Sequence, residues 1–229
     1  MRGARPGACE GACIRIANVC TKKTALIIVD VQPTFTEGGE LAVEGGEAVA
    51  QTIHDFVERE RGRYALIATT QDWHVDPGDH WSAQPDYVDT WPRHGVAGSA
   101  NARLHPAIES LDVPHHIRKG QYAAAYSGFE GVEDNDERIP TRDEVDAAMA
   151  AGRSLDALLR AHGVTRVDIV GIALSHCVRD TALDAVARGY ETRVYEDLSV
   201  PVSAQLGAQA VERMRDAGVT IIEGERYVD

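Results

Sequence analysis

The chain has 229 residues, of which 44% are apolar, so it is long enough to form one domain around a sizeable core. Its formal net charge of −13 at pH 7 disfavours nucleic acid and anionic membrane surfaces as partners. No apolar run approaches the length of a transmembrane helix, and the first twenty residues lack the apolar stretch of a signal peptide.

Three of the four cysteines lie close to the N-terminus, at Cys9, Cys13 and Cys20, and their spacing matches no strong zinc motif. We expect residues 1–23 to form a disordered N-terminal extension and residues 24–229 to form a single domain. Cys177 is then the only cysteine of the domain. This count argues against a disulfide framework and predicts a reducing, cytoplasmic location.

Continuous apolar runs alternate with segments of helical periodicity along the domain. Strands are predicted at 24–31, 64–70, 115–119, 167–172, 192–196 and 219–222. Helices are predicted at 46–61, 153–162, 176–188 and 203–217, and polar loops at 71–100 and 123–141. This order predicts a single-domain α/β fold, a doubly wound, mainly parallel six-stranded sheet with helices on both faces.

Chemically active side chains follow four of the predicted strands. Asp30 ends the first strand, Asp72 and His74 follow the second, Lys119 follows the third and Cys177 follows the fourth. Because ligands of such sheets bind beyond the carboxyl ends of the strands, we expect these side chains to meet in one cleft.

Asp30, Lys119 and Cys177 form a candidate catalytic set. A cysteine at the start of a helix is expected to have a lowered pKa, because the free N–H groups there stabilise a thiolate. The Asp30 carboxylate suits a general base, and the Lys119 ammonium suits a group that stabilises the developing thiolate. Singly, the three suggest a turn residue, a surface lysine and an inert buried cysteine, whereas their shared placement favours catalysis.

A second set comprises Asp72, His74, His80 and His94. Asp72 and His74 share one face of an extended segment, and the long loop adds the other two imidazoles. Three nitrogen donors and one carboxylate suit zinc, iron or manganese. The alternative is a group of loop histidines whose nitrogens are satisfied by hydrogen bonds within the protein.

Aromatic residues are only 6% of the chain, yet several lie near these motifs. The aromatic residues near the motifs are Phe35, Trp73, Trp81, Trp91, Tyr122 and Tyr126. Such a lining would hold a flat aromatic ligand, and ordinary loop packing is the competing interpretation.

The motifs together resemble those of the nicotinamidases and pyrazinamidases in the isochorismatase-like cysteine hydrolase family. They are Ala-Leu-Ile-Ile-Val-Asp-Val-Gln, Asp-Trp-His-Val-Asp-Pro-Gly-Asp-His-Trp-Ser, Trp-Pro-Arg-His-Gly-Val, Lys-Gly-Gln-Tyr-Ala-Ala-Ala-Tyr-Ser-Gly-Phe-Glu-Gly and Gly-Ile-Ala-Leu-Ser-His-Cys-Val. The resemblance covers roughly residues 24–224, which identifies 24–229 as an isochorismatase-like hydrolase domain.

The resemblance implies a metal-dependent cysteine amidohydrolase. The enzyme would convert nicotinamide to nicotinic acid and ammonia through a thioester, would also hydrolyse pyrazinamide, and would serve NAD salvage and pyridine nucleotide biosynthesis. The implied catalytic residues are Asp30, Lys119 and Cys177, and the implied ligands of one divalent ion (zinc, iron or manganese) are Asp72, His74, His80 and His94. The implied substrate-binding residues are Phe35, Trp91, Tyr126 and Ala173. The implied oxyanion site comprises Ile172, Ala173 and Cys177, with a cis peptide bond between the first two.

Three other interpretations remain open at this point. A related cysteine amidase would act on a carbamoyl or ureido amide, and such relatives typically lack the full set of one aspartate and three histidines. A non-catalytic protein would bind pyridine carboxamides, and a zinc-stabilised structural protein would not need Cys177. The expected partner is the small-molecule substrate nicotinamide, and a homo-oligomer is possible. The sequence fixes neither the oligomeric state nor the identity of the metal.

Overall fold

The computed structural model describes residues 22–136 and 138–223. Cys9, Cys13, Cys20 and all but two residues of the expected N-terminal extension lie outside the described residues. The division of the chain at residue 23 therefore stays a prediction.

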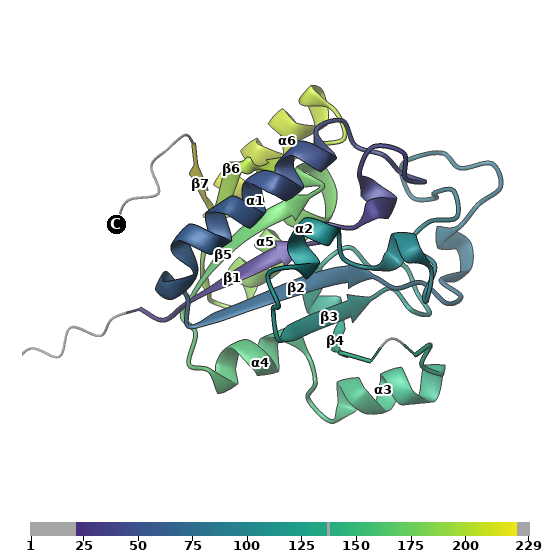
Figure 1. The fold of residues 1–229 in the computed structure, drawn as a ribbon, viewed down its shortest axis with the longest axis horizontal. Helices are drawn as coiled ribbons and strands as arrows, with labels where there is room; N and C mark the ends of the chain where they lie inside the picture. The colour runs from purple at the N-terminus through teal and green to yellow at the C-terminus, as the bar shows by residue number, and fades with distance from the viewer. Residues whose placement is uncertain (1–21, 137, 224–229) are drawn as a thin grey trace, which may run out of the picture.

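The centre of the molecule is a seven-stranded sheet in the order β4-β3-β2-β1-β5-β6-β7 (Figure 1). The strands are β1 (Thr24–Val29), β2 (Leu66–Asp72), β3 (His115–Lys119), β4 (Val132–Glu133), β5 (Arg166–Ile172), β6 (Glu191–Val200) and β7 (Thr220–Ile222). All neighbouring strands are parallel except β3 and β4, which are antiparallel. The predicted fold class is confirmed. The seventh strand, β4, falls in a predicted loop because two residues are too few to show a period.

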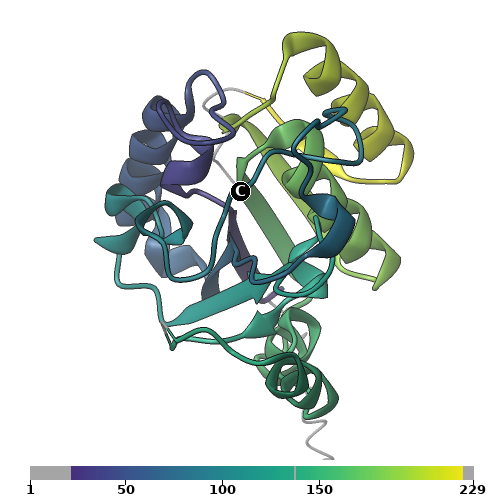
Figure 2. The same cartoon turned by 90° about the vertical axis from the view of Figure 1, so that its right-hand side faces the viewer.

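Helices cover both faces of the sheet, as Figure 2 shows nearly end-on to the strands. The helices are α1 (Gly46–Glu60), α2 (Pro106–Glu109), α3 (Arg142–Ala150), α4 (Leu155–Ala161), α5 (Arg179–Ala187) and α6 (Ala204–Asp216). In β1, Leu26 and Ile28 pack against α1 and α2, while Ala25 and Ile27 pack on the opposite face with α4, α5 and α6. Burial on both faces explains why β1 is a continuous apolar run.

Two of these helices are absent from the prediction. Helix α2 has only four residues, and α3 buries none of its side chains and lies outside the main body of the fold (Figure 1). A helix without a buried face shows no apolar stripe in its sequence. The predicted helix at 176–188 is also different, because a π-helical turn, Leu174–Val178, precedes α5.

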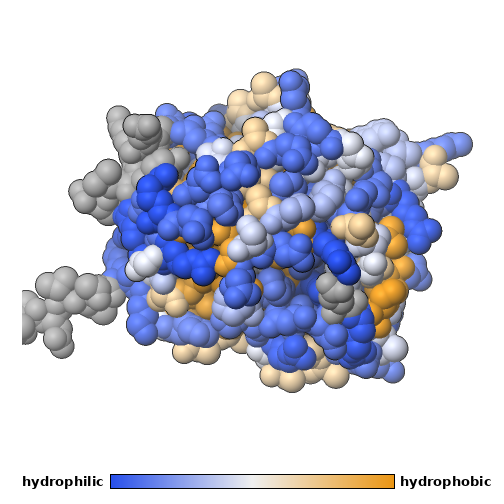
Figure 3. All heavy atoms as spheres, in the orientation of Figure 1, coloured by the Kyte–Doolittle hydropathy of each residue, from blue (hydrophilic) through white to orange (hydrophobic). Residues whose placement is uncertain are grey.

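The visible surface of the described residues is mainly hydrophilic, with apolar atoms in small separate patches (Figure 3). Among those residues, no helix combines the length and the apolar character needed to cross a membrane.

A buried ion pair joins β5 to β6 at the end of the sheet away from Cys177. Arg193 Nε and Nη2 donate to the two carboxylate oxygens of Asp168 over 2.7 and 2.6 Å. The hydroxyls of Tyr64 and Tyr195 donate to the same carboxylate over 3.1 and 3.0 Å. Because the Asp168 side chain is fully buried, its charge depends on these four donors.

We expect Asp168→Asn to lower the free energy of unfolding by about 3–5 kcal/mol, because it leaves the Arg193 charge inside the protein without a carboxylate. Urea unfolding followed by circular dichroism measures the change. Asp184→Asn is the matched control, since Asp184 pairs with Arg188 on the surface of α5 and such pairs contribute about 0.3–0.5 kcal/mol. Equal stabilities for the two variants would contradict the expectation.

Candidate active site

The carboxyl ends of β1, β2, β3 and β5 bring four functional side chains together. Asp30 follows β1 with a left-handed φ of 48°, and its N–H donates to the Thr70 carbonyl of β2 over 3.2 Å. Asp72 and Lys119 are the last residues of β2 and β3, and they are paired in the sheet register. Cys177 lies in the π-helical turn that follows β5. The parallel sheet therefore sets the spacing of the site before any loop contributes.

Lys119 is the centre of this cluster, and its side chain is completely buried. Its Nζ lies 3.0 Å from Asp30 Oδ2 and 3.7 Å from Cys177 Sγ, and it also pairs with Asp72 Oδ1. The other Asp30 oxygen accepts a hydrogen bond from Thr70 Oγ1 over 2.6 Å. One ammonium thus contacts two carboxylates and the thiol.

The electrostatics of the cluster differ from the sequence expectation at Cys177. Burial raises the pKa of the thiol well above its ordinary value, and the Asp30 and Asp72 carboxylates add to this, while Lys119 opposes it. The prediction of a lowered thiol pKa is therefore wrong for this structure. It considered the helix start alone, whereas burial and two nearby anions dominate.

The pKa values of the Asp30 and Asp72 carboxylates are shifted in opposite directions. Burial raises the pKa of Asp30 in spite of the neighbouring Lys119 ammonium. Burial alone would also raise the pKa of Asp72, but Lys119 and His74 hold it well below its usual range. The same carboxylates outweigh burial at Lys119 and hold its pKa well above its ordinary value. Asp72 and Lys119 are therefore a permanent charge pair, and Asp30 is the more basic carboxylate.

His74, His80 and His94 form a buried group beside Asp72. One nitrogen of each ring lies within 4.8 Å of the others. Asp72 Oδ2 lies 3.5 Å from His74 Nε2 and 3.6 Å from His94 Nε2, distances longer than ordinary hydrogen bonds. Three imidazole nitrogens therefore surround one point, and the Asp72 carboxylate lies next to two of them.

The hydrogen bonds behind these rings fit metal ligation. His74 Nδ1 is 2.6 Å from the Gly120 carbonyl and His94 Nδ1 is 2.7 Å from the Pro92 carbonyl, so each Nδ1–H donates and each Nε2 keeps its lone pair. In the described part of the chain, His74 Nε2 and His80 Nδ1 are buried without a hydrogen-bond partner. Burial and the two other imidazoles lower the pKa of His80 to about 4, which keeps it neutral. Histidines satisfied by hydrogen bonds alone would leave no such orphaned nitrogens, so the residues fit a divalent cation.

Side chains of the consecutive residues 72–74 point alternately to opposite sides of the backbone. Asp72 and His74 face the site, and Trp73 lies on the opposite side, where the Arg118 guanidinium is 3.8 Å from its ring centroid. Trp73 is buried there and does not line the cavity. Of the six aromatic residues noted in the sequence, three line the cavity, and they are Phe35, Trp91 and Tyr126.

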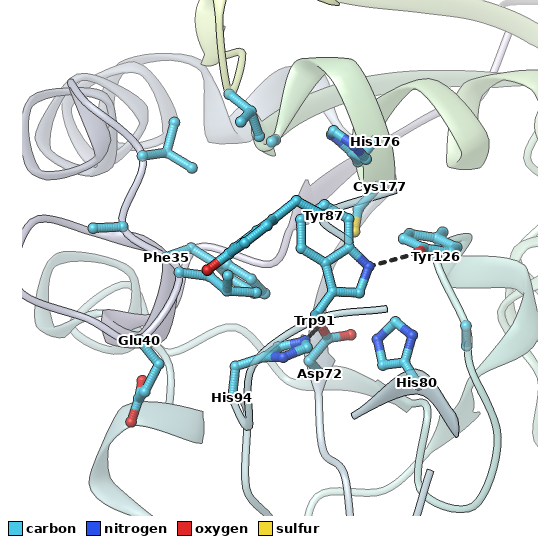
Figure 4. A pocket seen from close by; sticks show the side chains of 16 residues that line it. Phe35, Glu40, Asp72, His80, Tyr87, Trp91, His94, Tyr126, His176 and Cys177 are labelled. Carbon is cyan, nitrogen blue, oxygen red and sulfur yellow. Dashed lines mark hydrogen bonds and ion pairs between the residues drawn. The ribbon is translucent and has the colours of Figure 1, made fainter. Parts of the chain in front are cut away.

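A cavity of about 280 Å³ opens beside Cys177 (Figure 4). Its lining residues include Phe35, Asp72, His80, Trp91, His94, Tyr126, Ala173 and Cys177. Trp91 Nε1 donates a hydrogen bond to the Tyr126 hydroxyl over 2.8 Å, which fixes both rings in the wall. Ile172 is in the core and does not line the cavity, and its peptide bond to Ala173 is cis. The cavity is near the lower end of the size range of small-molecule sites.

The comparisons with known proteins agree with this geometry. The isochorismatase domain model matches residues 24–226. The chain belongs to the isochorismatase family.

The chain is similar to a protein matched by sequence and to solved structures whose names refer to nicotinamide, pyrazinamide or nicotinate. The chain is 46% identical over 198 residues to the nicotinamidase/pyrazinamidase of Mycobacterium tuberculosis, covering 86% of this chain and 97% of that protein. It is similar to the crystal structure of the Pyrococcus horikoshii pyrazinamidase in complex with zinc, with 32% identity, a TM-score of 0.68 and coverage of 88% and 99%. It is also similar to the crystal structure of PnC1 from L. infantum in complex with nicotinate, with 31% identity, a TM-score of 0.70 and coverage of 88% and 93%.

Within this isochorismatase domain, sequence reasoning missed several residues of the cavity wall, among them Glu40, Tyr87 and Val202. Tyr87 has a left-handed φ of 58° in a turn where Asp86 Oδ1 accepts hydrogen bonds from the N–H groups of Val88, Asp89 and Thr90. The Asp86 turn is a recognisable local signal. It does not reveal which way Tyr87 points, because that depends on where the long loop lies in space.

The opposite effects of Lys119 and Asp30 on the thiol are testable. We expect Lys119→Met to raise the pKa of Cys177 and Asp30→Asn to lower it, because the first removes a cation and the second an anion. The pH dependence of iodoacetamide alkylation in metal-free protein, read by mass spectrometry of the peptide that contains Cys177, measures both shifts.

In the unmodified chain, the alkylation rate should keep rising above pH 9 without a plateau. Asp184→Asn serves as the control, because that carboxylate lies on α5 at the surface. A plateau near neutral pH in the unmodified chain, or shifts of the same sign in both variants, would contradict the electrostatic assignment.

Proposed function

We propose that this protein is a metal-dependent cysteine amidohydrolase that converts nicotinamide to nicotinic acid and ammonia through a thioester, and that also hydrolyses pyrazinamide. The observation that carries the proposal is that Cys177, with Lys119 and Asp30 behind it, opens on the same cavity as two of the three grouped histidines. Relatives named nicotinamidase or pyrazinamidase at 46% and 32% identity support the substrate.

The reaction begins with the flat ring between the side chains of Phe35 and Trp91, with Tyr126 completing the wall. Asp30, the carboxylate whose pKa is raised, takes the proton of the Cys177 thiol. The sulfur then attacks the carboxamide carbon, and Lys119 stabilises the negative charge on the sulfur until the bond forms.

The tetrahedral intermediate carries its charge on the former carbonyl oxygen, and the N–H groups of Ala173 and Cys177 are proposed to bind it. Asp30 returns its proton to the departing amine, which leaves as ammonia and yields the thioester. Asp30 then takes a proton from a water molecule that attacks the thioester. The carbon–sulfur bond breaks, the proton returns to Cys177, and nicotinic acid leaves.

Asp72, His74, His80 and His94 are proposed to hold one divalent ion, which would be zinc, iron or manganese. A bound cation supplies a positive charge that accepts the lone pair of the pyridine nitrogen and orients the ring. The zinc in the Pyrococcus horikoshii structure supports a divalent metal for this chain.

The cellular setting belongs to the same proposal. A role in NAD salvage and pyridine nucleotide biosynthesis follows from the product, and a cytoplasmic location follows from Cys177 being the only cysteine of the domain. The proposed partner is the small-molecule substrate, and neither nucleic acid nor a membrane is a proposed partner. The proposal is compatible with a homo-oligomer.

We expect the metal-replete protein to release ammonia from nicotinamide and from pyrazinamide, and Cys177→Ala to lower kcat by about 10⁴-fold or more, as loss of a catalytic nucleophile does. A coupled glutamate dehydrogenase assay measures the ammonia. The triple substitution of Cys9, Cys13 and Cys20 by serine is the thiol control, and it should retain activity. Ammonia release from Cys177→Ala at the unmodified rate would contradict the mechanism.

The same assay separates the alternative functions. Turnover of a carbamoyl or ureido amide without turnover of nicotinamide would indicate the related amidase. Binding of nicotinamide without ammonia release would indicate a pyridine-carboxamide binder. A protein that unfolds on chelation and loses nothing in Cys177→Ala would indicate a structural metal site.

Metal removal gives an independent test of the histidine set. We expect chelation to reduce turnover on the order of 100-fold, and added zinc, iron or manganese to restore it. His94→Ala should bind no stoichiometric metal, whereas Cys177→Ala should bind it as the unmodified chain does. Full activity with metal content near zero would overturn the metal assignment.

A further inference from the structure

A chain of hydrogen bonds runs from the buried His94 loop to Glu40 in the wall of the cavity. The Gly95 N–H donates to Thr34 Oγ1 over 3.2 Å, and the Thr34 hydroxyl donates to Glu40 Oε2 over 2.8 Å. Thr34 is completely buried, and Glu40 lines the cavity near His94 and Phe35 (Figure 4). None of these side chains takes part in the proposed reaction.

The chemistry of the groups fixes which of them donates and which accepts in each hydrogen bond. A threonine hydroxyl has one hydrogen, and because Thr34 gives it to a carboxylate, the oxygen must accept from the Gly95 N–H. The other Glu40 oxygen, Oε1, accepts from Asn101 Nδ2 over 2.9 Å. Glu40 thus orients the hydroxyl and joins it to the short helix Ala100–Ala102.

The Gly95 peptide to which this chain leads is held between three metal-ligand candidates. It follows His94 directly, and its carbonyl accepts the His74 N–H over 2.8 Å. Its φ is 53°, and a Cβ added there would lie only 2.9 Å from Asp72 Cβ. The peptide is so closely packed that a shift of Gly95 would displace the side chains around it.

Thr34, the middle member of this hydrogen-bond chain, lies next to the aromatic wall of the cavity. Thr34 lies in the short helix Pro33–Phe35, next to Phe35, whose ring centroid is 6.0 Å from that of His94. The hydrogen bond from Gly95 to Thr34 therefore links the segment that carries the metal-ligand candidate to the segment that carries the aromatic ring.

We propose that Thr34 and Glu40 are positioning residues that fix His94 relative to Phe35, and that they thereby set both metal affinity and the binding of the aromatic substrate. The proposal rests on the proposed function, because the roles of His94 and Phe35 belong to it. Thr34 and Glu40 touch neither the metal nor the reacting atoms. They act through the Gly95 peptide.

The test compares Thr34→Val, which removes the hydroxyl at nearly constant shape, with Thr34→Ser, which keeps it. Zinc affinity of the metal-free protein is measured by competition with a chromophoric chelator, and KM and kcat for nicotinamide are measured on the loaded protein. We expect Thr34→Val to weaken zinc binding by about 10- to 100-fold, the usual effect of losing a group that orients a ligand, and to raise KM. Thr34→Ser should restore both.

Glu40→Gln tests the other end of the chain without changing its shape. We expect it to weaken zinc binding less than Thr34→Val does, because a glutamine oxygen can still accept from Thr34 while its NH₂ group opposes Asn101. Glu44→Gln is the matched control, since it removes an exposed charge from the same loop, and it should change neither quantity. Glu40→Gln also decides the matter if Thr34→Val does not fold.

Unchanged zinc affinity and KM in Thr34→Val and Glu40→Gln would overturn the inference, as would a Thr34→Ser variant as weak as Thr34→Val. A lower melting temperature with unchanged zinc affinity would also overturn it, because that result shows a purely structural hydroxyl. These results differ from failure of the proposed function, in which the unmodified chain itself binds no zinc or releases no ammonia.

Discussion

The structure depends most on one buried ammonium. Lys119 Nζ has no access to solvent, so its charge must be balanced inside the protein, and Asp30 and Asp72 balance it. Two carboxylates around one lysine leave one negative charge in excess, and the thiol of Cys177 lies next to it. The sheet makes this arrangement by ending three parallel strands side by side. Each strand contributes its group at the same edge, so the cluster is as rigid as the core beneath it.

Asp72 connects the two parts of the site. Its Oδ1 pairs with Lys119, and its Oδ2 faces His74 and His94. One carboxylate therefore serves the charge balance of the thiol cluster and the donor set of the histidines.

The sequence predicted what periodicity and strand ends can reveal. Six of the seven strands, the parallel sheet and the meeting of the side chains after β1, β2, β3 and β5 all follow from apolar runs that end in polar residues. Features without a local pattern were not predictable, which is why β4, α2 and α3 were missed. The pKa of Cys177 was predicted in the wrong direction because burial and the distance to Asp72 are properties of the folded chain. Glu40 and Tyr87 lie in loops whose paths no periodicity encodes.

The proton arrangement of the cluster explains how a buried cysteine can serve as a nucleophile without a permanent thiolate. The thiol keeps its proton because burial disfavours a thiolate, and because a thiolate in the resting site would also be a third anion against a single ammonium. Transfer of that proton to Asp30 moves a negative charge from oxygen to sulfur and leaves the total unchanged. Lys119 contacts both atoms between which the charge moves, so its attraction is retained through the transfer. The energetic cost is then set by the difference between the two pKa values, and the raised pKa of Asp30 reduces that difference.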